Sequence, residues 1–407
     1  MTALWKSNRR VLFGISGGIS AYKAPQIVRA LRSYNCEVEI ILTEAAEKFV
    51  APLVLSTLAE RKVWRQSDFL NPEEGWKIPH IKLADWAEVA VVAPATANVL
   101  RRAALGEAET LLGAALLATR APVLIFPAMN VHMWEHEATQ EHVGRLQELG
   151  YFVFEPEEGE LACGYEGKGR LPSVDVILEE IWRSLCPKKD LKGKHVLVTA
   201  GPTWEFIDPV RFLSNPSSGK MGYAMARTAW YRGAEVVLVS GPVGLPQPHW
   251  AHLVSATSAE EMGRAVMEHL SWADVIVKAA AVSDFRAEER KSQKIKRQGR
   301  DKLDLQLVQN PDIAAAVGLN KRQDQLLIGF AAESEDLLEN ARSKMARKGL
   351  DMIVVNDITV PGAGFTSDTN VVKVLDPKGV IAELKGSKEA VADAIWEIAT
   401  TRLPSAR

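Results

Sequence analysis

The sequence predicts an α/β protein with two doubly wound, Rossmann-like domains in tandem, each built on a parallel sheet. Apolar runs rich in β-branched residues alternate with stretches of helical periodicity, a pattern typical of strands that helices cover on both faces. The pattern breaks in the polar, basic segment 186–194 and then starts again. We therefore expect a first domain over residues 1–185, a linker over 186–194 and a second domain over 195–407.

The first domain opens with a predicted βαβ unit. Val11–Phe13 is expected as a short strand, residues 14–20 as a glycine-rich loop, and Ala21–Ser33 as a helix. The β-branched run Val38–Leu42 predicts the second strand. Later strands are expected at Val89–Ala93, in a run that starts near Asp85, and at Val123–Pro127.

The second domain repeats this order. His195–Thr199 is an expected strand, a loop follows over 200–203, and Met221–Arg232 has helical spacing before a strand at Val236–Val239. The run Ser271–Val277 is similar to the run near Asp85 and predicts a further strand. This likeness fits a shared fold as well as a duplication.

Composition and charge exclude several classes of protein. The chain has 407 residues, with 49 basic and 51 acidic side chains and a net charge of −2, which argues against a nucleic-acid partner and offers no charged surface for a membrane. Three cysteines rule out a disulfide scaffold and suit a reducing compartment. The N-terminus lacks an apolar signal region, and the longest aliphatic run, Leu111–Ala118, is too short to span a bilayer. We expect a soluble cytoplasmic protein.

The first glycine-rich loop favours an anion. Its pattern, Gly14-x-x-Gly17-Gly18, is neither the dinucleotide fingerprint nor a Walker A motif. A loop between a strand and a helix still suits a phosphate or a flavin, because backbone amides and the helix dipole attract negative charge, and Ser16 can add a hydroxyl. Thr43 ends the second strand near the place where an acidic residue holds the ribose in NAD enzymes. The loop alone therefore does not exclude NAD as the ligand, and it does not exclude a plain tight turn without a ligand.

Polar residues follow two later strands of the first domain. Thr96 and Asn98 come after the strand that contains Pro94, and Asn130 comes after Pro127. Ligands of open α/β sheets bind beyond the carboxyl ends of strands, so these side chains are candidate contacts. A helix cap is an equally good interpretation of Thr96 and Asn98, and a better one for Asn130 when it is considered alone.

Histidines and cysteines supply further candidates. His80 is expected in a loop before a strand, where an imidazole can act as a general base near neutrality, although a structural role is more common. His132 and His136 have metal-ligand spacing on a helix, but no third ligand is evident. Cys163 lies in a polar, glycine-rich segment that suits a mobile functional lid. Cys36 and Cys186 are expected to be inert.

The second half carries a second set of polar segments. Residues 214–221 place hydroxyls, amides and a lysine at a helix N-terminus, which suits an anion. Asp284 follows an expected strand and is a candidate Mg²⁺ ligand. The basic run 291–297 is either a solvated surface or a flap over a triphosphate. Asn310–Ile313 starts a helix, with a plain cap as the alternative, and Lys344 and Lys348 share one helical face that suits two phosphate contacts.

In combination, these motifs resemble one known family. From about residue 9 to about residue 400 the sequence is similar to the bacterial bifunctional enzymes of coenzyme A biosynthesis, in which phosphopantothenoylcysteine decarboxylase is fused to phosphopantothenate–cysteine ligase. The motifs that carry the resemblance are Ser16–Ile19, Pro127–Asn130, Ala162–Gly164, Ser214–Asn215, Ser217–Gly222 and Lys294–Lys296.

The resemblance implies that the first half is an FMN-dependent decarboxylase with a flavodoxin-like fold of the flavin-containing cysteine decarboxylase type. In such enzymes the flavin oxidises the substrate thiol to a thioaldehyde, CO₂ leaves, and reduced flavin reduces the enethiol. His80 matches the catalytic histidine, Asn130 the residue that binds the substrate carboxylate, and Cys163 the proton donor of the last step. The expected flavin contacts are Ser16, Gly17, Gly18, Thr43, Pro94, Thr96 and Asn98.

The resemblance implies that the second half is a ligase. It joins 4'-phosphopantothenate to cysteine through an acyl-cytidylate made from CTP with Mg²⁺, for which Asp284 is the expected metal ligand. Asn215 matches the residue that contacts the acyl-cytidylate, and Lys294 matches the flap lysine needed for activation. The expected CTP contacts are Ala279, Ala280, Asp284, Lys294, Asn310, Pro311, Asp312, Ile313, Phe330, Lys344 and Lys348.

The family also implies a homo-oligomer, with trimer-based decarboxylase domains and paired ligase domains. A non-catalytic flavin-binding regulator and a flavin prenyltransferase remain alternatives, although neither requires His80, Asn130 and Cys163 together with an intact ligase half. A plain NAD dehydrogenase is disfavoured by the loop spacing. The chain departs from the family pattern at Glu109–Thr110, at Lys278, where a small residue is common, and at Ser283.

Overall fold

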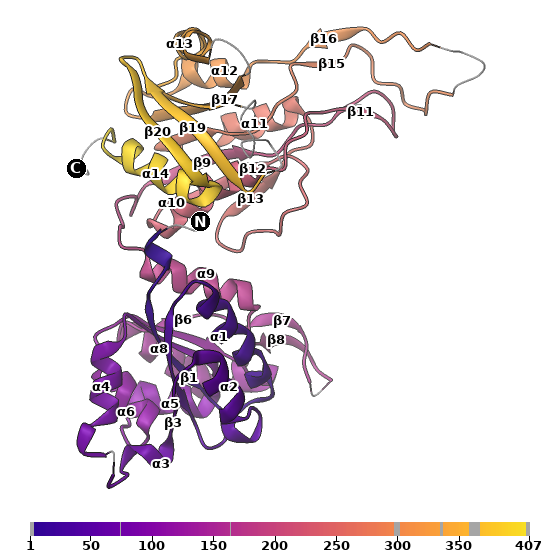
Figure 1. Ribbon diagram of the computed structural model, residues 1–407. Coiled ribbons are helices and arrows are strands. Elements are labelled where there is room, and N and C mark those ends of the chain that lie inside the picture. Colours follow the sequence, from indigo (N-terminus) through magenta and orange to yellow (C-terminus); the bar gives the residue numbers. More distant parts are fainter. Residues whose placement is uncertain are drawn as a thin grey trace. The chain divides into compact units, whose positions relative to one another are not determined.

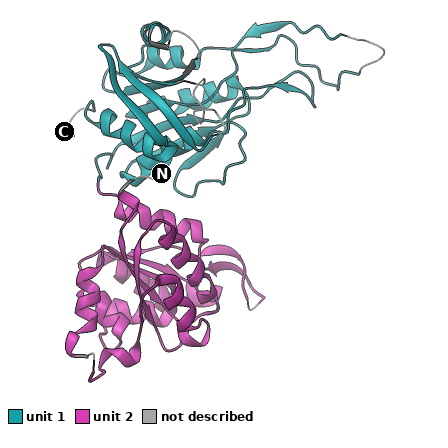
Figure 2. Ribbon diagram, in the orientation of Figure 1, with its two compact units in different colours: residues 1–4, 188–407 teal, residues 5–187 magenta. Residues whose placement is uncertain are grey.

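The computed structural model describes residues 4–73, 75–162, 164–296, 302–333, 337–357 and 367–403. The chain divides into two compact units (Figure 2). One is Trp5–Pro187, here called the N-terminal unit, and the other begins at Lys188 and is called the C-terminal unit. Within the described ranges, no helix is both long enough and apolar enough to cross a membrane.

The N-terminal unit is built on a sheet of parallel strands in the order β3-β2-β1-β4-β5-β6 (Figure 1). The central strands are buried, β4 along its whole length and β1 after Arg10, because helices cover both faces of the sheet. A separate antiparallel hairpin, β7–β8, follows the sheet in sequence. The strands are β1 (Arg10–Ile15), β2 (Glu37–Leu42), β3 (Val63–Arg65), β4 (Val89–Ala95), β5 (Val123–Pro127), β6 (Phe152–Val153), β7 (Glu157–Glu160) and β8 (Glu166–Arg170).

Two helical layers cover this sheet. Helix α1 packs against α2 and α9, while α4 contacts α6 and α5 contacts α8. Helices α4, α5, α6 and α8 pack against β1, β4 and β5 and form one buried core with them, which includes Leu12, Leu112 and Ile125. The helices are α1 (Ala24–Ser33), α2 (Pro52–Ala59), α3 (Gln66–Phe69), α4 (Pro79–Trp86), α5 (Ala97–Leu105), α6 (Leu111–Ala118), α7 (Val131–Glu135), α8 (Glu137–Glu148) and α9 (Val174–Leu185), with 3₁₀ turns at Leu4–Lys6, Ile19–Lys23, Ala46–Lys48 and Gly75–Lys77.

The C-terminal unit has a mixed sheet in the order β13-β12-β9-β14-β17-β18-β19-β20, parallel as far as β18. The last two strands are antiparallel to their neighbours, which differs from the expected all-parallel sheet. Two short ribbons, β10–β11 and β15–β16, complete the strands. The bounds are β9 (His195–Ala200), β10 (Glu205–Phe206), β11 (Phe212–Leu213), β12 (Glu235–Ser240), β13 (His252–Ser255), β14 (Val275–Lys278), β15 (Phe285–Ala287), β16 (Leu307–Gln309), β17 (Leu326–Glu333), β18 (Met352–Asp357), β19 (Thr369–Asp376) and β20 (Gly379–Ser387).

Helices form two groups around this second sheet. Helix α10 packs against α14, whereas α11, α12 and α13 contact one another in sequence order. A buried core around Met262, Ile276 and Leu327 joins the α11–α13 group to the parallel strands. The helices are α10 (Lys220–Tyr231), α11 (Ala259–Leu270), α12 (Ile313–Asn320), α13 (Leu337–Lys348) and α14 (Lys388–Thr400).

Several expected boundaries are corrected by the structure. Strand β4 begins at Val89, because Asp85 and Trp86 complete the last turn of α4. Strand β14 likewise begins at Val275, and residues 271–274 form the turn after α11. The expected helix Ala21–Ser33 is a 3₁₀ turn followed by α1, which begins at Ala24.

Candidate active sites

The first cavity lies at the carboxyl ends of strands β1, β2 and β4. It has a volume of about 670 Å³, within the size range of small-molecule sites. Of the expected flavin contacts, the cavity is lined by Ser16, Gly17, Thr43, Thr96 and Asn98. Gly18 and Pro94 lie beside it in the chain without lining it. Glu109 and Thr110, which depart from the family pattern, are part of its wall.

The loop after β1 is held close to the loop after β4 by Ser16. This side chain is only 1% exposed. Its Oγ donates a hydrogen bond to the carbonyl of Pro94 at 2.7 Å and accepts one from the amide of Thr96 at 3.0 Å. A Cβ atom at Gly17 would lie 2.3 Å from the Cβ of Ala45, so only glycine permits the close approach of the loop after β1 to the loop after β2. The cavity is therefore a backbone-lined cradle at the start of helix α5.

His80 lies outside this cavity. It is in the first turn of α4, not in the loop that we expected, because Pro79 occupies the first turn of a helix and does not break one. Its ring packs edge-on against Phe69, with 5.3 Å between ring centroids. The buried Nδ1 has no hydrogen-bond partner among the described residues. Within the described residues, Nδ1 of the candidate base His80 thus has no hydrogen-bond partner.

Asn130 caps helix α7, and that helix contacts strand β8. Its Oδ1 accepts the amide of His132 at 2.9 Å, which is the cap role that the sequence favours when Asn130 is considered alone. The neighbouring Met129 amide donates to the carbonyl of Gly169 at 3.0 Å. Cys163 lies outside the described residues, but strand β8, which follows it in sequence, packs against the Asn130 segment.

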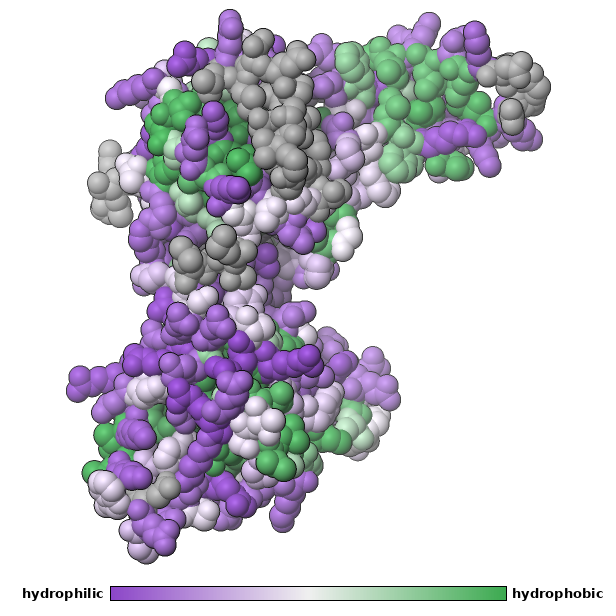
Figure 3. All heavy atoms as spheres, in the orientation of Figure 1, coloured by the Kyte–Doolittle hydropathy of each residue, from purple (hydrophilic) through white to green (hydrophobic). Residues whose placement is uncertain are grey.

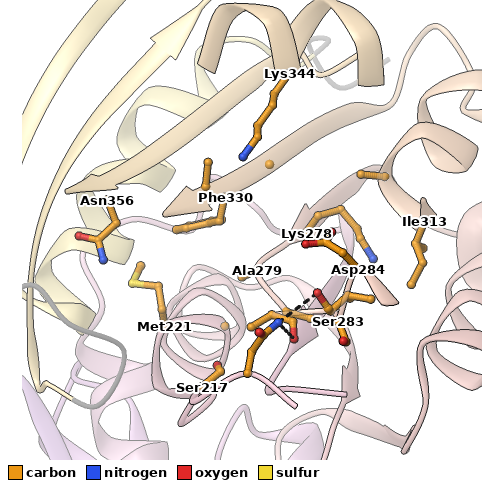
Figure 4. A pocket seen from close by; sticks show the side chains of 18 of the residues that line it. Ser217, Met221, Lys278, Ala279, Ser283, Asp284, Ile313, Phe330, Lys344 and Asn356 are labelled. Carbon is orange, nitrogen blue, oxygen red and sulfur yellow. Dashed lines mark hydrogen bonds between the residues drawn. The ribbon is translucent and has the colours of Figure 1, made fainter. Parts of the chain in front are cut away.

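The second cavity lies in the C-terminal unit, at the ends of β14, β17 and β18, and has a volume of about 460 Å³ (Figure 4). The structure brings together here every residue of the expected CTP set except Lys294. Asn215 also lines it. In Figure 4, Lys344 extends from α13 toward the cavity beside Phe330, while Asp284 and Ile313 lie on the opposite side. Segments that are far apart in sequence therefore converge on one concave site.

Two asparagines fix the loop that follows β14. Asn215 Nδ2 donates to the carbonyls of Ala281 and Val282, both at 3.2 Å. Asn310 Nδ2 donates to the carbonyl of Ser283 at 2.8 Å. The loop that carries Asp284 is thus held from both sides by amide side chains of the site.

The electrostatics of the second cavity favour an anion. Its described lining contains two carboxylates, Asp284 and Asp312, and six cations, namely Lys220, Lys278, Lys344, Arg347, Lys348 and Lys388. Asp312 Oδ1 caps α12 by accepting the Ala315 amide, and Lys348 Nζ lies 3.1 Å from Asp312 Oδ2. Burial opposes ionisation of Asp312, but these donors outweigh it and lower the pKa of the carboxyl.

Lys294 is exposed and does not line the second cavity. Its neighbour Ile295 is anchored, because the Ile295 amide donates to Asp208 Oδ2 at 3.1 Å. Arg211 bridges both partners, donating to Asp208 Oδ2 at 2.6 Å and to the Ile295 carbonyl at 3.2 Å. The described part of the basic run, Lys291–Lys296, is therefore anchored at Ile295, next to the exposed Lys294.

Comparison with known proteins assigns the chain to a family. Residues 3–186 match the family described as flavoprotein, and residues 191–402 match the DNA/pantothenate metabolism flavoprotein C-terminal domain. The chain is similar to the coenzyme A biosynthesis bifunctional protein CoaBC of Bacillus subtilis, with 44% identity over 93% of each chain. It belongs to this family.

Other members of the family are also similar. CoaBC of Escherichia coli K12 is 41% identical over 89% of this chain and 90% of the relative. A crystal structure of the C-terminal domain of a CoaBC protein is 40% identical and covers 53% of this chain and 97% of that one, with a TM-score of 0.45. As a family member, the chain is a bifunctional enzyme of coenzyme A biosynthesis with decarboxylase and ligase activities, a flavoprotein domain and small-molecule substrates.

The second cavity of this CoaBC-family protein also contains residues that sequence reasoning did not select. Lys278, Asn356, Asn370 and Lys388 line it from the ends of β14 and β18, from β19 and from the start of α14. Only Lys278 had a visible signal, since a lysine ends the otherwise apolar run of β14.

Proposed function

We propose that the C-terminal unit is the CTP-dependent phosphopantothenate–cysteine ligase and that the N-terminal unit is the FMN-dependent phosphopantothenoylcysteine decarboxylase. One observation carries the assignment of the ligase: residues of the expected CTP set, from four separate stretches of chain, line one cation-rich cavity. The product of the ligase is then the substrate of the decarboxylase, which yields 4'-phosphopantetheine.

The ligase must turn a carboxylate, which is a poor electrophile, into an activated acyl group. In our proposal the carboxylate of phosphopantothenate attacks the α-phosphorus of CTP, pyrophosphate leaves, and the amine of cysteine then displaces CMP. Cationic side chains such as Lys344 and Lys348 stabilise the charge that develops on the phosphates. Asn215 binds the acyl-cytidylate. Lys294 moves over the triphosphate, while the neighbouring Ile295 stays anchored to Asp208.

Asp284 fits a role in holding Mg²⁺. Its side chain is exposed at the cavity, and no cluster of three or more metal-ligating side chains occurs among the described residues. This agrees with the habit of Mg²⁺, which is bound by one or two carboxylates together with substrate phosphates. When bound, the ion would supply charge neutralisation at the transferring phosphate.

The first cavity fits a flavin phosphate and ring. The glycine cradle at Gly17 and the polar side chains of Thr96 and Asn98 at the start of α5 are the donor set that such an anion needs. Bound FMN would take two electrons from the substrate thiol and return them after CO₂ has left. Asn130 holds the substrate carboxylate, His80 acts as the base, and Cys163 supplies the last proton.

A homo-oligomer is part of the proposal, with the decarboxylase units arranged around a trimer. Two features of the N-terminal unit support it. His80 does not line the cavity that would hold the flavin, and large apolar side chains are exposed on the 3₁₀ turn Ile19–Lys23 and on α2, including Ile19, Tyr22 and Leu53. Contiguous exposed apolar side chains are typical of protein interfaces.

The ligase units are proposed to pair. Figure 3 shows a hydrophobic area over the ribbon arm formed by β15–β16 and its neighbour β10–β11. The exposed apolar side chains of this arm include Val210, Phe212, Phe285, Leu303 and Leu307. An apolar arm of this kind supports a dimer contact.

One reaction followed by mass spectrometry tests the proposal. The purified protein is mixed with phosphopantothenate, cysteine, CTP and Mg²⁺, and we expect 4'-phosphopantetheine together with CMP and pyrophosphate. Accumulation of phosphopantothenoylcysteine would retain the ligase and contradict the decarboxylase assignment. The absence of any CTP-dependent product would contradict the assignment of the second cavity.

A further inference from the structure

Lys278 is a buried lysine in the wall of the second cavity. It ends strand β14, which lies between β9 and β17 in the middle of the sheet, and all four residues of the strand are buried. Lys278 itself is 8% exposed. Figure 4 shows its side chain among the residues of the cavity, extending in the direction of Ile313. The fold therefore places a lysine amine at the end of a central strand, in the wall of the cavity proposed to bind the nucleotide.

The amine of Lys278 has no hydrogen-bond partner among the residues that the structure describes. The charged groups that face it are Asp312, at the start of α12, and Lys348, at the end of α13. Asp312 is already engaged, because it caps α12 and pairs with Lys348 at 3.1 Å. The nearby carboxylate is thus shared with another lysine, and the buried amine of Lys278, a residue of the cavity wall, has no anion of its own among the described residues.

A buried amine in this state destabilises the unliganded protein, because burial removes water from the charge without replacing it by a partner. Burial lowers the pKa of Lys278 to about 7, with Asp312 acting in the opposite direction and Lys348 in the same one. An anion that enters the cavity would supply the missing partner and restore the charged form.

We propose that Lys278 is a further nucleotide-binding residue, whose ammonium group donates to an anionic phosphate oxygen of CTP beside Lys348. The excess of cations over carboxylates in the lining favours phosphate over the uncharged base or sugar as the group it contacts. This inference rests on the proposed function, which puts CTP in this cavity.

Proton uptake on binding follows from the proposal. In the free protein at about pH 8, one unit above the pKa of Lys278, most of these side chains are neutral. A phosphate oxygen within hydrogen-bonding distance raises that pKa, so CTP binding at this pH takes up part of a proton. At about pH 6 the lysine is already charged, and the uptake disappears.

Titration calorimetry on the full-length protein tests the inference with two ligands, CTP and cytidine, in the presence of Mg²⁺ and without the other substrates. Wild type, Lys278→Met and the control Lys373→Met are compared at about pH 8 in two buffers of different ionisation enthalpy. Lys373 is a half-exposed lysine of β19 that does not line the cavity, so its loss changes the net charge by the same amount and breaks only its surface pair with Glu383. Methionine fills most of the volume of lysine without its charge.

We expect Lys278→Met to bind CTP at least about tenfold more weakly, equivalent to about 1.4 kcal/mol, and cytidine within about twofold of wild type. Wild type and Lys373→Met should take up protons with CTP, and Lys278→Met should not. The melting temperature of unliganded Lys278→Met should equal or exceed that of wild type, because the variant removes a buried unpaired amine. If Lys278 had only a structural role, its loss would not weaken the binding of CTP while leaving the binding of cytidine unchanged.

Three results would overturn the inference. The first is unchanged CTP affinity in Lys278→Met, and the second is an equal loss for CTP and cytidine. The third needs no variant, since CTP binding by wild type without proton uptake at about pH 8 contradicts a contact between phosphate and Lys278. If wild type bound no CTP at all, the proposed ligase function would fail as well, which separates that failure from the other three.

Discussion

At the residue scale, the two activities depend on different side chains, so they can be removed one at a time. Lys294 projects from the anchored basic run of the C-terminal unit. Lys294→Gln should lower CTP-dependent pyrophosphate release by about a hundredfold or more, because a charge that stabilises the transferring phosphate is lost. Decarboxylation of supplied phosphopantothenoylcysteine should be unchanged. Loss of both activities would contradict the assignment of two separate sites.

Cys163→Ser tests the other half. A serine hydroxyl is a much weaker acid than a thiol, so the last proton transfer should fail after CO₂ has already left. We expect CO₂ release with accumulation of an oxidised enethiol product that mass spectrometry detects two mass units below phosphopantetheine, because it lacks two hydrogens. A normal yield of phosphopantetheine from this variant would rule out Cys163 as the donor.

Asp208 gives the ligase a pH dependence. Burial alone would raise the pKa of its carboxyl, but amide donors from Val210, Ile295 and Arg211, with the Arg211 side chain, lower it to about 2. Because the folded pKa lies below the unfolded value of about 3.9, the anchor is intact above that value and is lost as the pH falls toward 2.

Asp208→Asn should therefore weaken the contact that anchors Ile295, and with it the basic run, at neutral pH. We expect kcat of pyrophosphate release to fall about tenfold to a hundredfold, because Lys294 is misplaced and not absent. Proteolysis within 291–296 should also become faster. A variant with wild-type kcat and wild-type cleavage would show that the Asp208–Ile295 contact does not position Lys294.

At the scale of the elements, the hairpin β7–β8 and the segment before α7 fit one another through a glycine. A Cβ at Gly169 would lie 2.2 Å from the carbonyl oxygen of Met129, which is backbone and cannot move aside easily. Gly169→Ala should displace the hairpin that flanks Cys163, at a cost of about 1–3 kcal/mol. We expect decarboxylation to fall while the ligase rate is retained.

Gly144→Ala is the matched control for this prediction. Gly144 lies in α8 with nothing within 4 Å of an added Cβ, so alanine should be neutral or slightly stabilising there. Thermal unfolding and decarboxylase assays on both variants check the comparison. Equal activities in the two variants would show that the contact between Gly169 and Met129 has no part in catalysis.

At the scale of the whole molecule, the C-terminal unit is stabilised by an ion network around Arg232. This side chain, 1% exposed, ends α10 and pairs with Asp190 at 2.7 Å, with Asp393 at 3.1 Å and with Glu397. The network thus connects the start of the unit to α10 and α14. Arg232→Met would remove the cation that pairs with Asp190 and Asp393, whereas Glu397 would keep its ion pair with Lys188.

We expect Arg232→Met to lower the free energy of unfolding of the C-terminal unit by about 3 kcal/mol. Calorimetry should show the ligase transition at lower temperature, and the flavin-linked transition should not move. Arg264→Ala is the control, because the Arg264–Glu260 pair is exposed at 3.5 Å and should contribute less than about 1 kcal/mol. Equal shifts in the two variants would contradict the network.

Much of the fold was predictable because its signals are local. The buried parallel strands are continuous apolar runs, and β5 has the bounds that were expected. The antiparallel strands β19 and β20 were missed because they form an edge with alternating burial and no intervening helix, so they do not repeat the β–α pattern. His80 was misplaced because a proline before it suggests a loop as readily as the first turn of a helix.

The α/β class and the motifs by which the chain resembles its family can be read from the sequence alone, and a break near residue 186 is predicted from it. Periodicity and motif spacing are properties of neighbouring residues, so they can be read without the fold. Only the tertiary structure decided which of those residues share a cavity: it joined Asp312, Lys348 and the unselected Lys278 and left Lys294 and His80 outside. Strand order and register bring distant segments together, and the burial that changes the chemistry of Lys278 exists only once they have met.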